Sequence, residues 1–259
     1  MFLGMMKEMS CRPADAIFYR KILLIDTGMV MSIRNGEITS SLLKGWAGLS
    51  ELEMDVLQKE REASQKARQR LKDTLNTLIV PEEVLKEVAN HEYFFRERIR
   101  TLEKVNAPYL NERKHMHQIE RKKIECLRGY VEGLEAFREE SKGRDPRKES
   151  WINNRSYRVD SKGQAYKLAW DHFSQKVGAR HRIKNQPPSD ADTALLALAS
   201  LVYQRHRIIP CILTRDGDFE EIASEESQGA TPLKTEYVFS HTISFTSGPF
   251  AITIYTPRE

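Results

Sequence analysis

Three short apolar runs divide the chain. Residues 21–28 (KILLIDTG) place four consecutive aliphatic side chains before Asp26, and residues 75–80 (LNTLIV) form a second run. The third run covers residues 208–213. Continuous apolar runs of this length are typical of strands that are buried on both faces, as in parallel sheets. We therefore expect three buried strands.

The segments between these runs carry helix signals. Pro81 is followed by Glu82 and Glu83, which indicates a helix start, because proline needs no amide donor there and acids suit the positive end of the helix dipole. Ser189 is an expected N-cap ahead of an apolar helix. The expected helices cover residues 51–75, the segment after Pro81, 92–140, 165–177, 189–202 and 217–225.

Strands alternating with helices predict an α/β fold with a parallel sheet and flanking helices. Residues 141–165 have the composition of an exposed basic loop, and apolar residues alternate with polar ones on both sides of Gly248 and Pro249, which predicts a C-terminal β-hairpin. The domains that we expect are an N-terminal tail (1–20), a catalytic domain (21–90 plus 187–235), a charged helical insertion (91–186) and the hairpin (236–259).

Composition excludes several classes of protein. The 259 residues are 40% apolar, which is enough for a sizeable core and argues against a disordered chain. Three widely spaced cysteines argue against a disulfide framework and a zinc ribbon, and favour a reducing compartment. No apolar run approaches the ~20 residues of a membrane span, and the N-terminus lacks a signal-peptide core. We expect a soluble, cytoplasmic protein without membrane contact.

Charge is unevenly distributed. Residues 91–186 hold 23 basic and 14 acidic residues, a surplus that suits a polyanion binder and equally suits a solvated helical face. Aromatic rings lie among the cations, where they could stack unpaired bases; Tyr166 and Trp170 could instead dock their helix on the core. The expected nucleic-acid contacts are Arg144, Arg147, Lys148, Trp151, Arg155, Tyr157 and Arg158.

Acidic residues follow the predicted strands and open the predicted helices. Asp26 and Asp216 come after strands, Asp190 and Asp192 open a helix, and Glu87 lies inside another helix. Ligands of parallel α/β sheets bind beyond the carboxyl ends of the strands. Carboxylates that converge there need a cation, and oxygen ligands suit Mg²⁺ or Mn²⁺. The alternative for each position is a helix cap or a turn residue.

Four segments in order resemble a PIN-domain nuclease: ILLIDT (22–27), VPEEVLKEV (80–88), SDADTALLALA (189–199) and ILTRDGDF (212–219). The resemblance implies a PIN-like, Rossmann-type parallel sheet. The long segment 89–188 departs from the family's pattern, in which the corresponding connection is short. By the same resemblance, the catalytic metal-binding acids are Asp26, Glu87, Asp192 and Asp216, Asp190 and Asp218 are further acids within reach of the metal, and Thr214 orients the loop of Asp216.

The function implied by the resemblance is a ribonuclease that uses one or two Mg²⁺ or Mn²⁺ ions. Water attacks the phosphorus in line and leaves a 3′-hydroxyl and a 5′-phosphate, with single-stranded or structured RNA expected rather than DNA. The alternative is a catalytically silent PIN-like module that binds nucleic acid or a protein partner, and a homo-oligomer stays open. Asp26-Thr27-Gly28 also resembles an aspartic-protease triplet, but that class needs a strand-rich fold. A dehalogenase-type phosphatase needs a second Asp where Gly28 stands.

Overall fold

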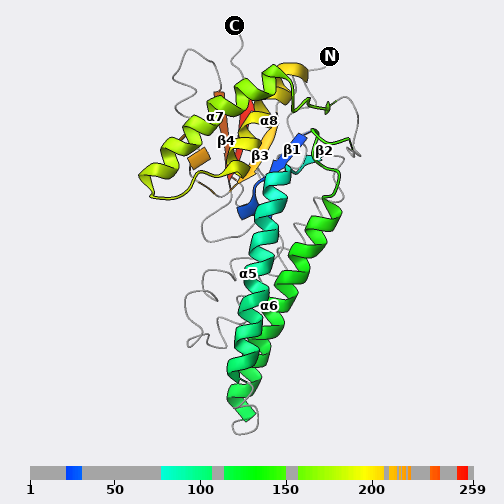
Figure 1. Cartoon of the computed structure of the whole chain (residues 1–259), viewed down its shortest axis with the longest axis vertical. Helices are drawn as coiled ribbons and strands as arrows, with labels where there is room; N and C mark the ends of the chain where they lie inside the picture. Colours follow the sequence, from blue (N-terminus) through cyan, green and yellow to red (C-terminus); the bar gives the residue numbers. More distant parts are fainter. Residues whose placement is uncertain are drawn as a thin grey trace, which may run out of the picture.

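The computed structural model describes residues 22–30, 77–106, 114–149, 157–206, 210–214, 216, 218–219, 221–222, 234–239 and 250–255. The strands are β1 (Ile22–Ile25), β2 (Thr77–Ile79), β3 (Cys211–Thr214), β4 (Lys234–Phe239) and β5 (Phe250–Tyr255). The long helices are α5 (Glu82–Asn106), α6 (Lys114–Glu140), α7 (Gln164–Ile183) and α8 (Asp190–His206) (Figure 1). The expected tail 1–20 and the expected helix 51–75 lie outside the described residues.

The strands form one mixed sheet in the order β2-β1-β3-β5-β4. β1 runs parallel to β2 and to β3, with Leu23 opposite both Leu78 and Cys211. β5 is antiparallel to β3 and to β4, and Phe239 lies opposite Phe250. The fold is therefore α/β, as the sequence predicts, and the antiparallel strands β5 and β4 extend the parallel half of the sheet. β4 ends at Phe239, where the first arm of the expected hairpin begins, and the rest of that arm lies outside the described residues.

The core is built around β1 and α8. All four residues of β1 are buried, because strands pair with both of its edges and side chains cover both of its faces. The helix α8 is buried along its whole first part, from Ala191 to Val202. A helix that is apolar on all sides belongs in the interior of a protein. This burial brings the polar start of α8 to the edge of the sheet.

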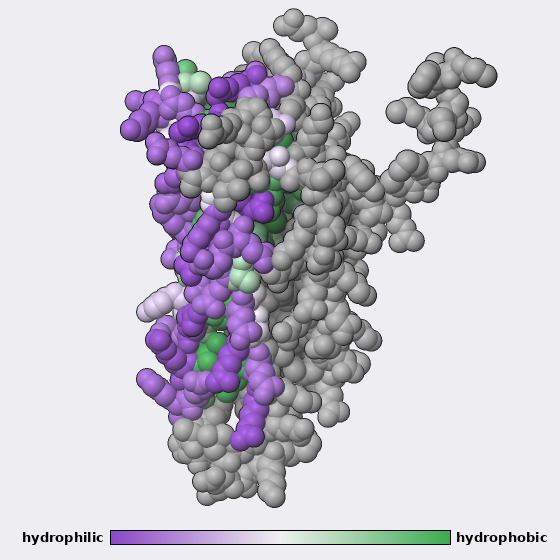
Figure 2. All heavy atoms as spheres, turned by 90° about the vertical axis from the view of Figure 1, so that its right-hand side faces the viewer, coloured by the Kyte–Doolittle hydropathy of each residue, from purple (hydrophilic) through white to green (hydrophobic). Residues whose placement is uncertain are grey.

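Two long helices, α5 and α6, pack side by side and extend away from the sheet (Figure 1). Phe95 of α5 meets Tyr130 of α6 edge to face, with ring centroids 4.6 Å apart. Ion pairs flank this contact, among them Arg128 with Glu103 at 2.6 Å. On the side drawn in Figure 2, the described surface is largely hydrophilic. Among the described helices, none combines the length and the apolar character that a membrane crossing requires.

The structure corrects the outline of the expected insertion. α5 continues without a break through residue 90, where the expected boundary lies. The helix expected at 165–177 extends to Ile183, and α7 packs on α8 through buried residues that include Phe173 and Val177. The stretch 141–165 is not an exposed loop throughout, since Asp145 and Val159 are buried. α7 therefore packs on α8 as part of the sheet domain.

Candidate active site

A cleft of about 480 Å³ opens beside the carboxyl ends of β1 and β3. Acids reach it from four separate segments, namely the end of β1, the second turn of α5, the first turn of α8 and the residue that lies two positions after β3. The lining residues are Asp26, Thr27, Gly28, Glu87, His91, His181, Ser189, Asp192 and Asp216. The four acids that the PIN resemblance implies as catalytic are thus brought together.

Asp26 is buried at the junction of the two central strands. Its backbone amide donates to the carbonyl oxygen of Leu213 at 2.9 Å, and its Oδ2 accepts a hydrogen bond from the Thr214 hydroxyl at 2.9 Å. Burial raises the pKa of Asp26 to about 7; the Thr214 hydrogen bond lowers it, and the charges of Glu87 and Asp216 raise it. Thr214 also accepts a hydrogen bond from the amide of Asp216 at 3.0 Å, so one hydroxyl orients both acids.

Glu87 links the end of β1 to the start of α8. Its Oε2 accepts a hydrogen bond from the Thr27 hydroxyl at 2.7 Å, and its Oε1 accepts one from the Ser189 hydroxyl at 3.1 Å. Ser189 is also the N-cap of α8, because its Oγ accepts the amide of Asp192 at 3.1 Å. The Glu87 carboxylate is therefore held in one orientation by hydroxyl groups on both sides.

Asp192 has the most perturbed acidity in the cleft. Burial, together with the charges of Asp26, Glu87 and Asp216, raises its pKa to about 9. Carboxylates that share a small buried volume disfavour each other's ionisation, and a cation among them reverses this effect. The electrostatics of the cleft therefore favour a bound cation.

His181 and Lys184, near the end of α7, lie close to acids in and beside the cleft. The sequence did not predict a role for either residue. Nδ1 of His181 donates to the carbonyl oxygen of Pro187 at 2.5 Å, since a carbonyl can only accept. The other ring nitrogen, Nε2, lies 3.3 Å from Oδ2 of Asp192 and has no aligned hydrogen bond. Nζ of Lys184 lies 2.5 Å from Asp218 and 3.6 Å from Asp216.

The two further acids predicted near the metal do not line the cleft. Asp190 is exposed on the first turn of α8, whereas Asp218 is buried behind Asp216. The amide of Asp218 donates to Oδ1 of Asp216 at 2.9 Å, and its carboxylate pairs with Lys184. Asp218 thus supports the loop of Asp216, and its Oδ2 lies 3.9 Å from Nε2 of His181, which lines the cleft.

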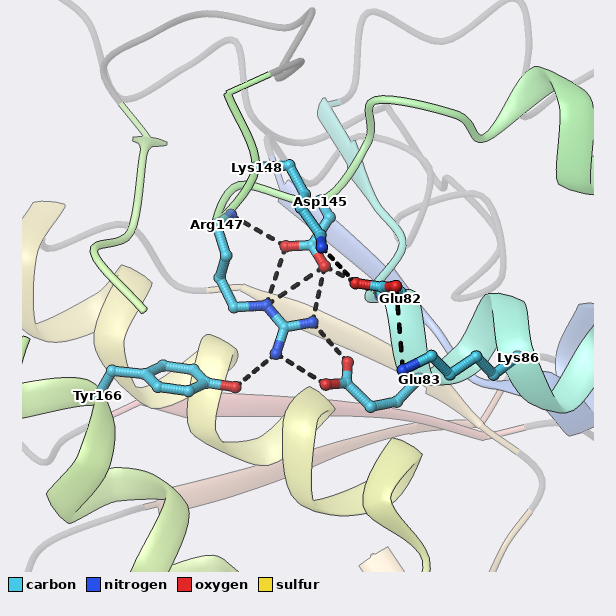
Figure 3. A network of polar contacts seen from close by, with 7 residues as sticks. All are labelled: Glu82, Glu83, Lys86, Asp145, Arg147, Lys148 and Tyr166. Carbon is cyan, nitrogen blue, oxygen red and sulfur yellow. Dashed lines mark hydrogen bonds and ion pairs between the residues drawn. The ribbon is translucent and has the colours of Figure 1, made fainter. Parts of the chain in front are cut away.

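Arg147, an expected nucleic-acid contact, is instead the centre of a buried polar network (Figure 3). Its guanidinium donates to Glu83, to Asp145 and to the Tyr166 hydroxyl, and its side chain is only 9% exposed. Oδ2 of Asp145 accepts the amide of Glu82 at 2.9 Å, which caps the start of α5. Arg147 therefore links three parts of the structure: α5, α7 and the loop that follows α6. Its guanidinium is held by these partners and cannot reach a phosphate group.

The remaining expected nucleic-acid contacts are divided. Lys148 is exposed and pairs with Glu82 at 2.5 Å, and Arg144 donates from Nε to the carbonyl oxygen of Glu140. The ring of Tyr157 packs edge-on against His206, while Arg158 is exposed. Trp151 and Arg155 lie outside the described residues. Of the expected contacts that the structure describes, Lys148 and Arg158 are exposed, whereas Arg144, Arg147 and Tyr157 are partly buried.

The acids of the cleft offer the donor chemistry that Mg²⁺ and Mn²⁺ prefer, since all are carboxylate oxygens. The raised pKa values of Asp26 and Asp192 fit the same interpretation, because a divalent ion would relieve their repulsion. Within the ranges that the structure describes, however, no three His, Cys, Asp or Glu side chains are already arranged as metal ligands.

Comparison with known protein families found no match to this chain. Curated proteins and solved structures also gave no match.

Proposed function

We propose that this cleft is the active site of a metal-dependent nuclease of the PIN type, which hydrolyses phosphodiester bonds in RNA. The observation that carries the proposal is the meeting of four acids from distant segments in one cleft: Asp26, Glu87, Asp192 and Asp216. Their position beside the carboxyl ends of parallel strands is where α/β sheets bind ligands. The preference for RNA and the finer PIN-like topology rest on the resemblance of the four sequence segments.

The same four acids would hold Mg²⁺ or Mn²⁺. A bound ion would supply a water of lowered pKa and would stabilise the charge that develops on the phosphate. The chain's own residues orient the ligands: Thr214 positions Asp26, and the hydroxyls of Thr27 and Ser189 position Glu87. Hydrogen bonds from neighbouring side chains to the ligands fix the geometry of a metal site.

One observation favours the silent-module alternative. Lys184 already lies between Asp216 and Asp218, where an ammonium group neutralises part of the acidic charge. A protein of that class would neither bind Mn²⁺ in this cleft nor cleave nucleic acid. Mn²⁺ binding with micromolar affinity would stabilise an intact site by mass action, so thermal unfolding with and without Mn²⁺ separates the two functions.

Two glutamates on α5 provide a matched test of the nuclease proposal. Glu87 lines the cleft, whereas Glu82, on the first turn of the same helix, is partly exposed and pairs with Lys86 and Lys148. Glu87→Gln should lower the rate of Mn²⁺-dependent RNA cleavage by roughly 100-fold or more, because a metal ligand is lost. Glu82→Gln should leave the rate unchanged and reduce stability by at most about 1 kcal/mol. Equal rates for the two variants would contradict the proposed site.

A further inference from the structure

The face of α5 that lines the cleft continues beyond it. Residues three and four apart on a helix lie on the same face. Glu87 and His91 both line the cleft, and Phe94 follows His91 by three residues. At 1.5 Å per residue, His91 and Phe94 lie about 6 and 10 Å farther along the helix axis than Glu87. One face of α5 thus carries a carboxylate, an imidazole and a phenyl ring in succession. Figure 1 shows this helix extending away from the sheet.

Phe94 is exposed but firmly supported. Its residue is 52% exposed, although phenylalanine is usually a core side chain. The ring meets the buried Phe95 edge to face, with centroids 5.5 Å apart, and Phe95 in turn packs against Tyr130. The support comes from the packed interface between α5 and α6, so the ring is presented on a rigid element.

His91 supplies a second flat ring between Phe94 and the acids. It lines the cleft and is partly buried. Burial lowers its pKa, against the opposing effect of the Glu87 charge. Two flat rings therefore follow Glu87 at intervals of about one helical turn.

We propose that His91 and Phe94 form a stacking track for the bases next to the bond that is cleaved, which makes single-stranded nucleic acid the substrate class. The inference rests on the proposed nuclease function. Aromatic rings bind unpaired bases of any sequence, because every base has a π-face, whereas the bases of a duplex are stacked on each other. The continuity of the track with the acidic cleft favours a nucleic-acid strand over an apolar protein partner.

The adjacent tyrosine provides a matched control. Tyr93 is 67% exposed, but one residue along a helix turns the side chain by about 100°, so Tyr93 lies off the face that carries Glu87 and Phe94. Kd is measured in EDTA, which prevents cleavage, for labelled U12 RNA, dT12 DNA and a duplex. Phe94→Ala should weaken binding of both single strands roughly 5- to 150-fold, while Phe94→Trp retains affinity. Tyr93→Ala should bind like the wild type, and duplex binding should not depend on Phe94.

A base analogue reports stacking directly. The fluorescence of 2-aminopurine within the single strand should be quenched on binding to the wild type and to Tyr93→Ala, and less quenched on binding to Phe94→Ala. Equal affinities for Phe94→Ala and Tyr93→Ala would overturn the track, as would a wild type that binds neither single strand. If Phe94 governs binding but Mn²⁺ gives no cleavage, the track stands and the nuclease proposal fails. If Mn²⁺-dependent cleavage occurs and Phe94 has no effect on binding, the nuclease proposal stands and the track fails.

Discussion

The hydroxyl of Thr214 donates a 2.9 Å hydrogen bond to Oδ2 of Asp26, and this contact joins the ends of β3 and β1. Thr214 is fully buried, and its oxygen also accepts the amide of Asp216. The hydrogen bond lowers the pKa of Asp26 against the opposing effect of burial. Thr214 therefore holds the carboxylate in place and favours its ionised form.

Replacing this hydroxyl should destabilise the protein. Thr214→Val keeps the shape of the side chain but removes the hydrogen bonds of the hydroxyl to the buried Asp26 carboxyl and to the Asp216 amide, which should reduce the free energy of unfolding by about 1–3 kcal/mol. Urea unfolding at pH 8 measures the change, and Thr214→Ser should recover most of it. A Thr214→Val variant as stable as the wild type would show that the bond contributes nothing to stability.

The buried acids predict how stability depends on pH. The pKa values of Asp26 and Asp192 are raised in the folded state to about 7 and about 9, against 3.8 for the unfolded chain. The folded state therefore binds more protons, and the stability from these groups, fully present below pH 4, is lost as the pH rises through 7 and 9. The thermal midpoint without divalent ions should fall from pH 5 to 9.

An amide variant isolates one of these groups. Asp192→Asn cannot ionise, so its thermal midpoint should fall less steeply over the same pH range than that of the wild type. Mn²⁺ should raise the midpoint of the wild type most at high pH, where the acids are ionised. Identical slopes for the wild type and Asp192→Asn would contradict the raised pKa of Asp192.

Neighbouring cations in Figure 3 have different expected effects on stability. Arg147 is largely buried between Asp145 and Glu83, so Arg147→Met leaves two acids without their partner and should reduce the free energy of unfolding by about 3–5 kcal/mol. Lys148 is exposed and pairs with the partly exposed Glu82, so Lys148→Met should reduce the free energy of unfolding by at most about 1 kcal/mol. Denaturant unfolding compares the two variants; equal losses would show that the network of Arg147 is not a stabilising unit.

Local signals were enough to place several elements. The apolar run before Asp26 predicts β1, Pro81 with two glutamates predicts the start of α5, and Ser189 predicts the start of α8, where its hydroxyl accepts the amide of Asp192. These signals lie within a few residues of the structure that they specify. The acids of the cleft were then identified from the order of four short segments.

Contacts between distant segments could not be predicted in this way. Arg147 is basic, and its sequence neighbourhood predicted an exposed nucleic-acid contact. Its partners in the structure, Glu83 and Tyr166, are 64 and 19 residues away along the chain. His181 was missed because the apolar pattern of α7 predicts an end near residue 177, whereas the helix continues to Ile183. In the sheet, β5 lies between β3 and β4, although β4 comes before β5 in the chain. This order likewise depends on contacts across the whole sheet.

The measurement that tests the nuclease proposal most directly is Mn²⁺-dependent cleavage of single-stranded RNA by the wild type and by Asp26→Asn. The wild type should cleave RNA and bind Mn²⁺, and Asp26→Asn should do neither. Without metal, Asp26→Asn should be folded and at least as stable as the wild type at pH 8, because a buried carboxylate that repels Glu87 and Asp216 is removed. Cleavage by Asp26→Asn at the wild-type rate would contradict the proposed site.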